Sequence, residues 1–290
     1  MRLPLTPLVL ALAWGLNWPA VKIMLSALPP FTMRALGLGG GALLLVLLAL
    51  AQRRALWPPR EGWPAIVVGA ATVVGFNFCT AFAQLNTSTS RAAVLSFTMP
   101  MLAALIAWGW LGEKPGRRGL LALAVGGAGI AVLATPVLRG LGQGASLRGL
   151  VFPLLAALAW ALGTVASKRW PPVGDRLAVT AWQLGLAAAC GVAAAALAGE
   201  RLPAVWPAPV VGALAFHIVI ATALAYVLWY RQLERLSATV SSLTTLAVPV
   251  VGVLGAMALI GERPGAADAL GFVLVLGGAA LVLVPARPGR

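Results

Sequence analysis

Residues 111–116 read Leu-Gly-Glu-Lys-Pro-Gly, and residues 260–265 read Ile-Gly-Glu-Arg-Pro-Gly. The two stretches begin 149 positions apart in a chain of 290 residues, which is about half of its length. Each is a short polar interruption between long apolar runs. The pattern predicts that the chain consists of two copies of one hydrophobic unit, joined in tandem.

The composition is typical of a protein whose main solvent is lipid. Hydrophobic residues make up 61% of the chain and charged residues only 10%, whereas a soluble domain has about 45–50% apolar and about 25% charged residues. The sequence lacks the strict apolar–polar alternation that barrel strands of about ten residues show. We therefore predict an all-α integral membrane protein, because helices satisfy their own backbone groups in lipid.

Ten apolar runs are long enough to cross a bilayer, since a membrane helix needs about 20 mainly apolar residues. Breaks rich in Pro, Gly and Arg separate them. Five runs on either side of a short loop predict one unit at residues 1–136, a connection at 137–146 and a second unit at 147–286. The ten predicted transmembrane helices are residues 5–26, 31–51, 64–85, 92–111, 118–135, 148–168, 177–198, 208–230, 238–260 and 266–285.

The number of helices in each unit decides how the two units lie in the membrane. Two tandem units with an odd number of helices must have opposite orientations, which gives inverted repeats with a binding site near the midplane between them. Further positions correspond between the halves, since Trp14 matches Trp160 and Pro100 matches Pro249 in the same order along the chain.

The formal net charge is +14. No nucleic-acid recognition module is visible, so the basic loops are better explained by orientation and by contact with anionic lipids. With the N-terminus inside, 14 of the 21 Lys and Arg residues fall on the inner side and 7 on the outer side. This bias predicts a multi-pass protein of the bacterial inner membrane with both termini in the cytoplasm. Lys22, Arg34 and Lys168 lie near helix ends and are expected to reach the lipid head groups.

These features together resemble one family of membrane proteins. The resemblance rests on Trp14, Asn17 and Lys22, on Trp160 and Lys168, and on the two Gly-Glu-Lys/Arg-Pro stretches that follow Pro100 and Pro249. In these residues the chain is similar to the EamA group of the drug/metabolite transporter superfamily. The resemblance implies ten helices in two five-helix repeats, and the export of amino acids, other metabolites or drugs.

Trp14 and Asn17 share one face of the first predicted helix, because they are three residues apart. A buried amide needs hydrogen-bond partners, so Asn17 either orients a substrate in a midplane cavity or bonds a neighbouring helix. Trp160 and Thr164 form the matching face of the sixth helix. The two tryptophans either line the cavity or belong to the aromatic belt at the membrane surface.

His217 is the only histidine in the sequence, and it lies near the middle of the eighth predicted helix. An ionisable residue inside a membrane suggests a function, and an ordinary histidine pKa near 6.5 makes His217 the candidate for proton coupling. A neutral histidine bonded to a polar neighbour is the alternative. Asn77 lies at the corresponding place in the third helix and is its expected facing partner, and both are predicted to contact the substrate.

Phe97 in the fourth helix and Thr245 in the ninth helix are further candidates for substrate contact. They precede Pro100 and Pro249, which together with Pro19 are predicted to form hinges or gates. The competing interpretation is that these prolines and small residues only allow close helix packing.

Two acidic residues recur at helix ends. Glu113 and Glu262 each lie next to a cation, which suggests loop capping and local charge balance. Small residues at 126–129 and 277–280 favour close helix packing, either within a half or between the protomers of a homodimer.

The inventory of reactive residues argues against an enzyme. No catalytic triad, metal-ligand spacing or ATP-binding motif is present, so we expect no metal and no cofactor. The sequence predicts an alternating-access exporter of small metabolites, with amino acids, including aromatic ones, as the leading substrates. A multidrug or other metabolite exporter and a non-transporting membrane protein are the alternatives. No buried charge is evident in the predicted cavity, which favours a zwitterionic substrate.

Overall fold

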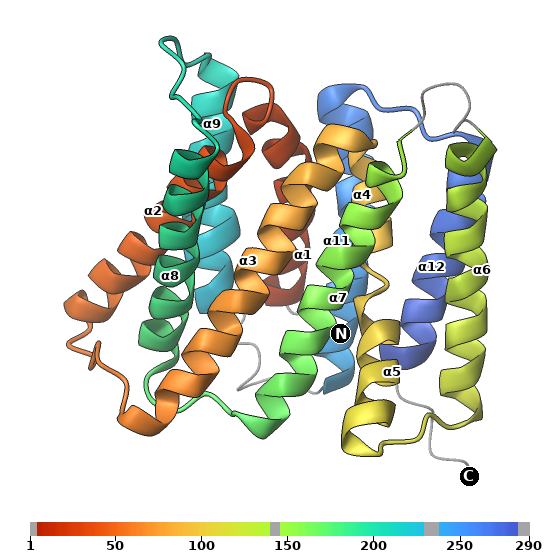
Figure 1. The fold of residues 1–290 in the computed structure, drawn as a ribbon, viewed down its shortest axis with the longest axis horizontal. Helices are drawn as coiled ribbons and strands as arrows, with labels where there is room; N and C mark the ends of the chain where they lie inside the picture. Colours follow the sequence, from red (N-terminus) through yellow and green to blue (C-terminus); the bar gives the residue numbers. More distant parts are fainter. Residues whose placement is uncertain (1–4, 140–145, 229–237, 284–290) are drawn as a thin grey trace.

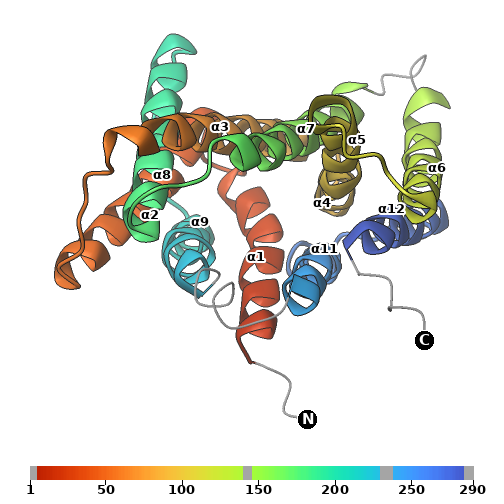
Figure 2. The same cartoon turned by 90° about the horizontal axis from the view of Figure 1, so that it is seen from below.

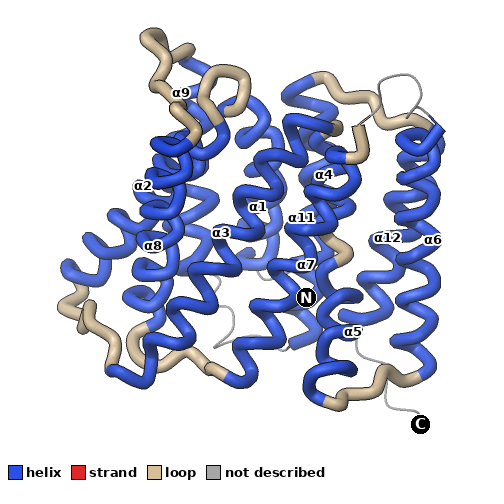
Figure 3. The backbone as a smooth tube through the Cα atoms, in the orientation of Figure 1, coloured by secondary structure: helices blue, strands red, loops and turns tan. Residues whose placement is uncertain are grey.

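The computed structural model of the chain describes residues 5–139, 146–228 and 238–283 (Figure 1). Within these ranges the regular structure is helical, and Figure 3 shows only helices and loops there. The elements are α1 (Leu5–Met24), α2 (Pro30–Ala51), the 3-10 turn η1 (Arg60–Gly62), α3 (Trp63–Asn86), α4 (Thr89–Ser96), α5 (Met99–Leu111), α6 (Arg117–Arg139), α7 (Arg148–Arg169), α8 (Arg176–Leu197), α9 (Ala208–Phe216), the π-helical segment η3 (His217–Leu224), α11 (Ala238–Ile260) and α12 (Ala266–Leu283).

The all-α membrane fold predicted from the sequence is confirmed. Among the described residues, eight helical segments are long and apolar enough to cross a membrane, and two shorter apolar helices, Leu246–Ile260 and Ala266–Leu281, complete the ten predicted positions. Large apolar side chains cover outward faces. Leu43, Leu47 and Leu50, for example, follow one face of α2 and are all more than half exposed, as expected of a surface in contact with lipid.

The repeated Gly-Glu-Lys/Arg-Pro stretches have the same structural role in both halves. Gly112 ends α5 with a φ of 71°, and Gly261 ends α11 with a φ of 69°. This left-handed conformation is open to glycine because it has no Cβ. Pro115 and Pro264 follow shortly after, where proline cannot continue the preceding helix. The motif therefore ends one membrane helix before the next begins.

The fourth predicted helix, residues 92–111, is not continuous. It consists of α4 and α5, which are separated at Phe97 and Thr98. Pro100 lies in the first turn of α5, where it lacks the N–H that would bond the carbonyl of Ser96 in an unbroken helix. The corresponding Pro249 lies inside the unbroken α11. The two halves therefore differ in conformation at equivalent positions.

The eighth predicted helix changes type halfway. It begins as α9, becomes a π-helix at His217, and returns to α-helix after Leu224. A π-helical turn is wider than an α-helical turn and often occurs at functional sites. The wider turn starts at the only histidine in the sequence.

Helices that correspond in the two halves pack in a pattern with two-fold symmetry. α2 packs against its counterpart α8, and α6 packs against its counterpart α12. Other contacts occur twice with exchanged roles: α1 packs on α11 and α9, while its counterpart α7 packs on α4, α5 and α3. In Figure 1, α1 ends on the upper side and α7 begins there, so these two equivalent helices run in opposite directions.

The two symmetric pairs lie at opposite ends of the molecule. The α2–α8 pair is at one end and the α6–α12 pair at the other, and α1 lies between them with α9 and α11 on either side (Figure 2). The α6–α12 contact is made by small residues. A Cβ at Gly278 would lie 2.8 Å from the backbone of α6 at Ala122 and Gly126. The small-residue runs thus join the two halves within one chain, and a homodimer remains a prediction.

Candidate functional site

A central cavity of about 220 Å³ lies between the two halves. Its walls come from both repeats, with residues from α1, α2, α3 and the α4–α5 break on one side and from α7, α8, the π-helical segment and α11 on the other. The lining residues are Trp14, Asn17, Trp18, Val21, Arg34, Leu38, Phe76, Asn77, Thr80, Gln84, Phe97, Met99, Trp160, Leu184, His217, Ala221, Thr222, Tyr226 and Val248.

Asn17 and His217 form the polar bridge between α1 and the π-helical segment. The Nδ1 atom of His217 lies 2.6 Å from the Oδ1 atom of Asn17. Because a side-chain amide oxygen only accepts hydrogen bonds, Nδ1 carries the proton in this arrangement. Asn17 therefore bonds a neighbouring helix, as one of the two interpretations of this residue predicted. It also lines the cavity, where a substrate could reach it.

Glycine makes room for the histidine ring. A Cβ at Gly37 of α2 would lie 2.6 Å from Nε2 of His217, well inside the contact distance of the two atoms. Gly41, one turn further along, faces Thr222 of the same π-helical segment. His217 is 3% exposed, and its Nε2 atom has no hydrogen-bond partner among the described residues. The ring is therefore enclosed between α1 and α2.

Arg34 corrects one prediction made from the sequence. Its place one turn into α2 suggested contact with lipid head groups, but the side chain is 2% exposed and lines the central cavity. Its Nη2 atom donates a hydrogen bond of 2.9 Å to Oγ1 of Thr80. The expectation that the cavity carries no buried charge is therefore wrong. Helix face, rather than distance from the helix end, decides where this arginine points.

The polar face of α3 supports the arginine. The hydroxyl of Thr80 donates to the backbone carbonyl of Asn77, at 3.0 Å, and this leaves its oxygen free to accept from Arg34. The Asn77 amide donates to the carbonyl of Val73 in its own helix, at 2.9 Å. Asn77 and His217 thus line the same cavity, but each is bonded to a different partner. That both face the same cavity is as predicted for a facing polar pair, and their contact with a substrate stays a prediction.

Aromatic side chains form much of the remaining wall. Trp14 donates from Nε1 to the carbonyl of Ala221 in the π-helical segment, at 3.1 Å, and its ring meets Tyr226 edge-on at 6.4 Å. Trp160 meets Phe76 edge-on at 5.0 Å. The structure places Trp14 and Trp160 at the cavity rather than at a membrane-surface belt. Rings held in this way can contact the apolar body of a ligand.

Some candidates do not reach the cavity. Thr164 is exposed, its hydroxyl donates to the carbonyl of Trp160 at 2.8 Å, and it is not among the residues that line the cavity, so its contact with a substrate stays a prediction. The side chain of Thr245 lies outside the described residues. Pro19 lies within α1 and faces α11 near Gly255. Nothing in the structure tests whether Pro19, Pro100 or Pro249 acts as a hinge.

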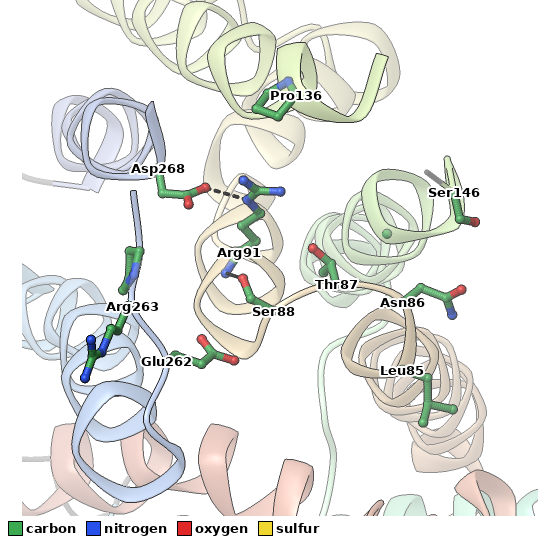
Figure 4. Close-up of a pocket in the computed structure, with 12 residues that line it drawn as sticks. Leu85, Asn86, Thr87, Ser88, Arg91, Pro136, Ser146, Glu262, Arg263 and Asp268 are labelled. Atoms are coloured by element: carbon green, nitrogen blue, oxygen red, sulfur yellow. Dashed lines mark hydrogen bonds and ion pairs between the residues drawn. The ribbon is translucent and has the colours of Figure 1, made fainter. Parts of the chain in front are cut away.

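A larger hollow of about 680 Å³ lies at the helix ends on the upper side of Figure 1, and Figure 4 shows its lining. The two carboxylates of its lining, Glu262 and Asp268, already have partners. Arg91 pairs with Asp268 at 2.5 Å, and the Glu262 carboxylate accepts hydrogen bonds from the N-terminus of α4 at Thr89 and Ser90. These contacts hold helix ends together, so the central cavity is the better candidate for a ligand site.

Glu113 and Glu262 have different partners although they occupy equivalent positions. Glu262 caps α4, whereas Glu113 pairs with Lys168 at 2.8 Å, and both side chains of that pair are more than half exposed. Neither bonds the cation next to it in the sequence. Lys22 donates to the backbone carbonyl of Gln84, so it too has a partner inside the protein rather than only among head groups.

Arg34, Thr80 and Gln84 are the main polar lining residues that the sequence did not single out as substrate contacts. A signal for Arg34 was present, since Arg34, Gly37 and Gly41 are spaced for one helix face. Two glycines on the face of a lone arginine indicate an interior side, because small residues mark close helix approach. Thr80 and Gln84 are four residues apart and so share one face of α3, but that spacing alone does not show which neighbour the face meets.

Comparison with known proteins identifies the family. The model of the EamA-like transporter family matches residues 4–135 and, a second time, residues 147–284. The chain belongs to the EamA-like transporter family. The double match agrees with the duplication read from the repeated stretches, and it makes the protein a multi-pass membrane transporter of the drug/metabolite transporter type.

Individual relatives extend over nearly the whole chain. The uncharacterized transporter YvbV of Bacillus subtilis (strain 168) is 28% identical over 291 residues, which cover 97% of this chain and 93% of that protein. The aromatic amino acid exporter YddG of Ancylobacter novellus is 25% identical over 283 residues, which cover 94% and 95%. A solved crystal structure with 25% identity covers 96% of this chain and 94% of its own, with a TM-score of 0.65.

Proposed function

We propose that this transporter exports small metabolites, and amino acids first among them, by alternating access around the central cavity. The observation that carries the proposal is the cavity itself, which lies between the two repeats and combines polar groups with aromatic rings. A site between inverted repeats is where alternating access requires it. The relative that is an aromatic amino acid exporter supports the same substrate class.

The size of the cavity favours a small substrate. Pockets for drug-sized ligands have volumes of about 300–1,000 Å³, whereas this cavity has about 220 Å³. Its volume equals that of about seven water molecules in the liquid. A metabolite with one ring fits this scale better than a large dye. The tryptophan and phenylalanine side chains of the walls suit an apolar or aromatic body.

The test is transport by the purified protein in liposomes. We expect uptake of radiolabelled phenylalanine, tyrosine or tryptophan above that of protein-free liposomes, and loss of uptake in the Trp160→Ala variant. Val192→Ala is the matched control, since Val192 is 61% exposed on the outer face of α8. No uptake of any amino acid by well-folded protein would refute the proposed substrate class.

Multidrug export is the second candidate, and the aromatic walls of the cavity favour it. The assay that separates the two is growth protection in cells. Protection against toxic amino-acid analogues supports the amino-acid exporter, whereas protection against cationic dyes alone supports the multidrug exporter.

Proton coupling through His217 and the orientation in the membrane also belong to the proposal. We propose that both termini face the cytoplasm of a bacterium, which the bias of Lys and Arg residues supports. A fluorescent protein fused to the C-terminus tests this orientation, since it should be folded and fluorescent inside the cell.

Uptake measured with and without a pH gradient tests the proposed proton coupling through His217. Uptake that is independent of the gradient would leave His217 a binding or structural residue.

A further inference from the structure

Arg34 is a buried cation whose hydrogen-bonding capacity is only partly used. Its Nη2 atom bonds Thr80, but its Nε atom is buried without a hydrogen-bond partner among the described residues. A guanidinium presents five donors in a fixed planar fork. Removing such a group from water is costly unless an anion or several acceptors receive it.

None of the described carboxylates pairs with Arg34. Asp175 pairs with Arg54, Asp268 with Arg91 and Glu113 with Lys168. Glu200 and Glu262 bond the N-termini of α2 and α4, Glu61 lies in η1, and Glu234 lies outside the described residues. The described lining of the cavity contains no Asp or Glu. Arg34 is therefore a positive charge that faces the cavity without an ion-pair partner there.

A carboxylate is the group that complements this arginine. Its two oxygens accept two parallel N–H bonds from a guanidinium, which is the strong bidentate geometry. The hydroxyl of Thr80 and the side chain of Gln84 lie on the adjacent face of α3 and also line the cavity. The aromatic rings of the other walls are placed to receive an apolar body.

The described lining of the cavity offers an ammonium group no carboxylate, so only aromatic faces and neutral acceptors are left to receive it. Nε2 of His217 is the one lone pair on that ring free to accept, but it lies against Gly37 and is enclosed there. The remaining acceptors are neutral amides, hydroxyls and carbonyls.

We infer that Arg34 binds the carboxylate of the substrate, and that the substrate class is aromatic or apolar carboxylic acids for which an amino group is not required. This inference rests on the proposed transport function of the same cavity. It differs from a zwitterion site in one respect. The carboxylate is essential to recognition, and the ammonium group is dispensable.

The experiment compares three ligands that share one ring and chain length. Binding of phenylalanine, hydrocinnamate and phenethylamine is measured by calorimetry on the full chain in detergent. We expect phenylalanine and hydrocinnamate to bind with affinities within about threefold of each other, and phenethylamine to bind at least about tenfold more weakly, as loss of a charge-assisted pair implies. Equal binding of phenethylamine and hydrocinnamate would overturn the inference while leaving the transport function intact.

Variants locate the effect at Arg34. We expect Arg34→Gln to weaken hydrocinnamate binding at least about tenfold, and Arg34→Lys to restore part of it because the charge is kept. The matched control is Arg148→Gln, which removes an exposed cation at the start of α7. Wild-type affinity of Arg34→Gln for hydrocinnamate refutes the assignment. If no ligand binds to folded wild-type protein, both the proposed substrate class and this inference fail.

Discussion

The contact between Gly37 and the ring of His217 leads to a sharp prediction. The Gly37→Ala substitution adds one methyl group, which would lie 2.6 Å from Nε2 of His217. The α2 backbone cannot retreat freely, because α2 also packs against α8, where a Cβ at Gly191 would lie 3.2 Å from the backbone of Ala35. The ring must therefore turn away from Asn17, or the π-helical segment must move away from α2.

The expected magnitude follows from two costs and one gain. Overpacking in a filled interior costs about 1–3 kcal/mol, and a broken hydrogen bond that leaves buried groups unpaired costs about 1–3 kcal/mol. Alanine recovers up to about 1 kcal/mol of helix propensity relative to glycine. We expect a net loss of about 1–5 kcal/mol, which corresponds to about 5- to 5,000-fold in substrate affinity if the loss falls on the binding conformation.

The assay is initial uptake of phenylalanine into liposomes, together with the thermal unfolding of the variant in detergent. Gly127→Ala is the control, since a Cβ at this position of α6 would have no neighbour within 4 Å. We expect the control to match wild type in both measurements. Wild-type uptake and stability of Gly37→Ala would refute the enclosed position of the His217 ring.

Three further predictions follow from the described contacts. Asn17→Ala and His217→Ala should each reduce uptake at least about tenfold, and the double variant should be little worse, because each residue is the other's partner. Glu262→Gln should lower the unfolding temperature by about 2–4 °C per kcal/mol lost, whereas Glu113→Gln should change it little, because its exposed ion pair is worth about 0–1 kcal/mol; equal shifts would contradict the cap. Thr164→Val should transport like wild type, and a loss of uptake would return Thr164 to the site.

The positions of the helices could be predicted from the sequence because hydrophobic length and the Gly-Pro breaks determine them. The conformation at Pro100 and Pro249 could not. Both prolines remove a hydrogen bond from a membrane helix, yet the first helix is broken and the second is unbroken. Which of two equivalent helices breaks depends on packing between the halves, and a repeated sequence carries no signal for that difference.

The aromatic and amide residues of the candidate site could be predicted from the sequence. Side chains spaced three or four residues apart, such as Trp14 and Asn17, can be assigned to one face of a membrane helix. Arg34 lies at the cavity although it is close to a helix end, because distance from a helix end does not determine which way a side chain points. Gly37 and Gly41 pack against the π-helical segment, and their contact turns the face of α2 that bears Arg34 toward the cavity. The π-helix itself left no pattern, since its apolar residues are those of any membrane helix.

The backbone contact between α6 and α12 has a mechanical consequence. Side chains that interdigitate can exchange rotamers and slide, whereas Gly278 against the backbone at Gly126 leaves no side chain to rearrange. We therefore expect the end of the molecule formed by these two helices to stay fixed during transport, as a pivot. Cysteines that crosslink α6 to α12 should leave transport intact, whereas a crosslink between α1 and α11 beside the cavity should stop it.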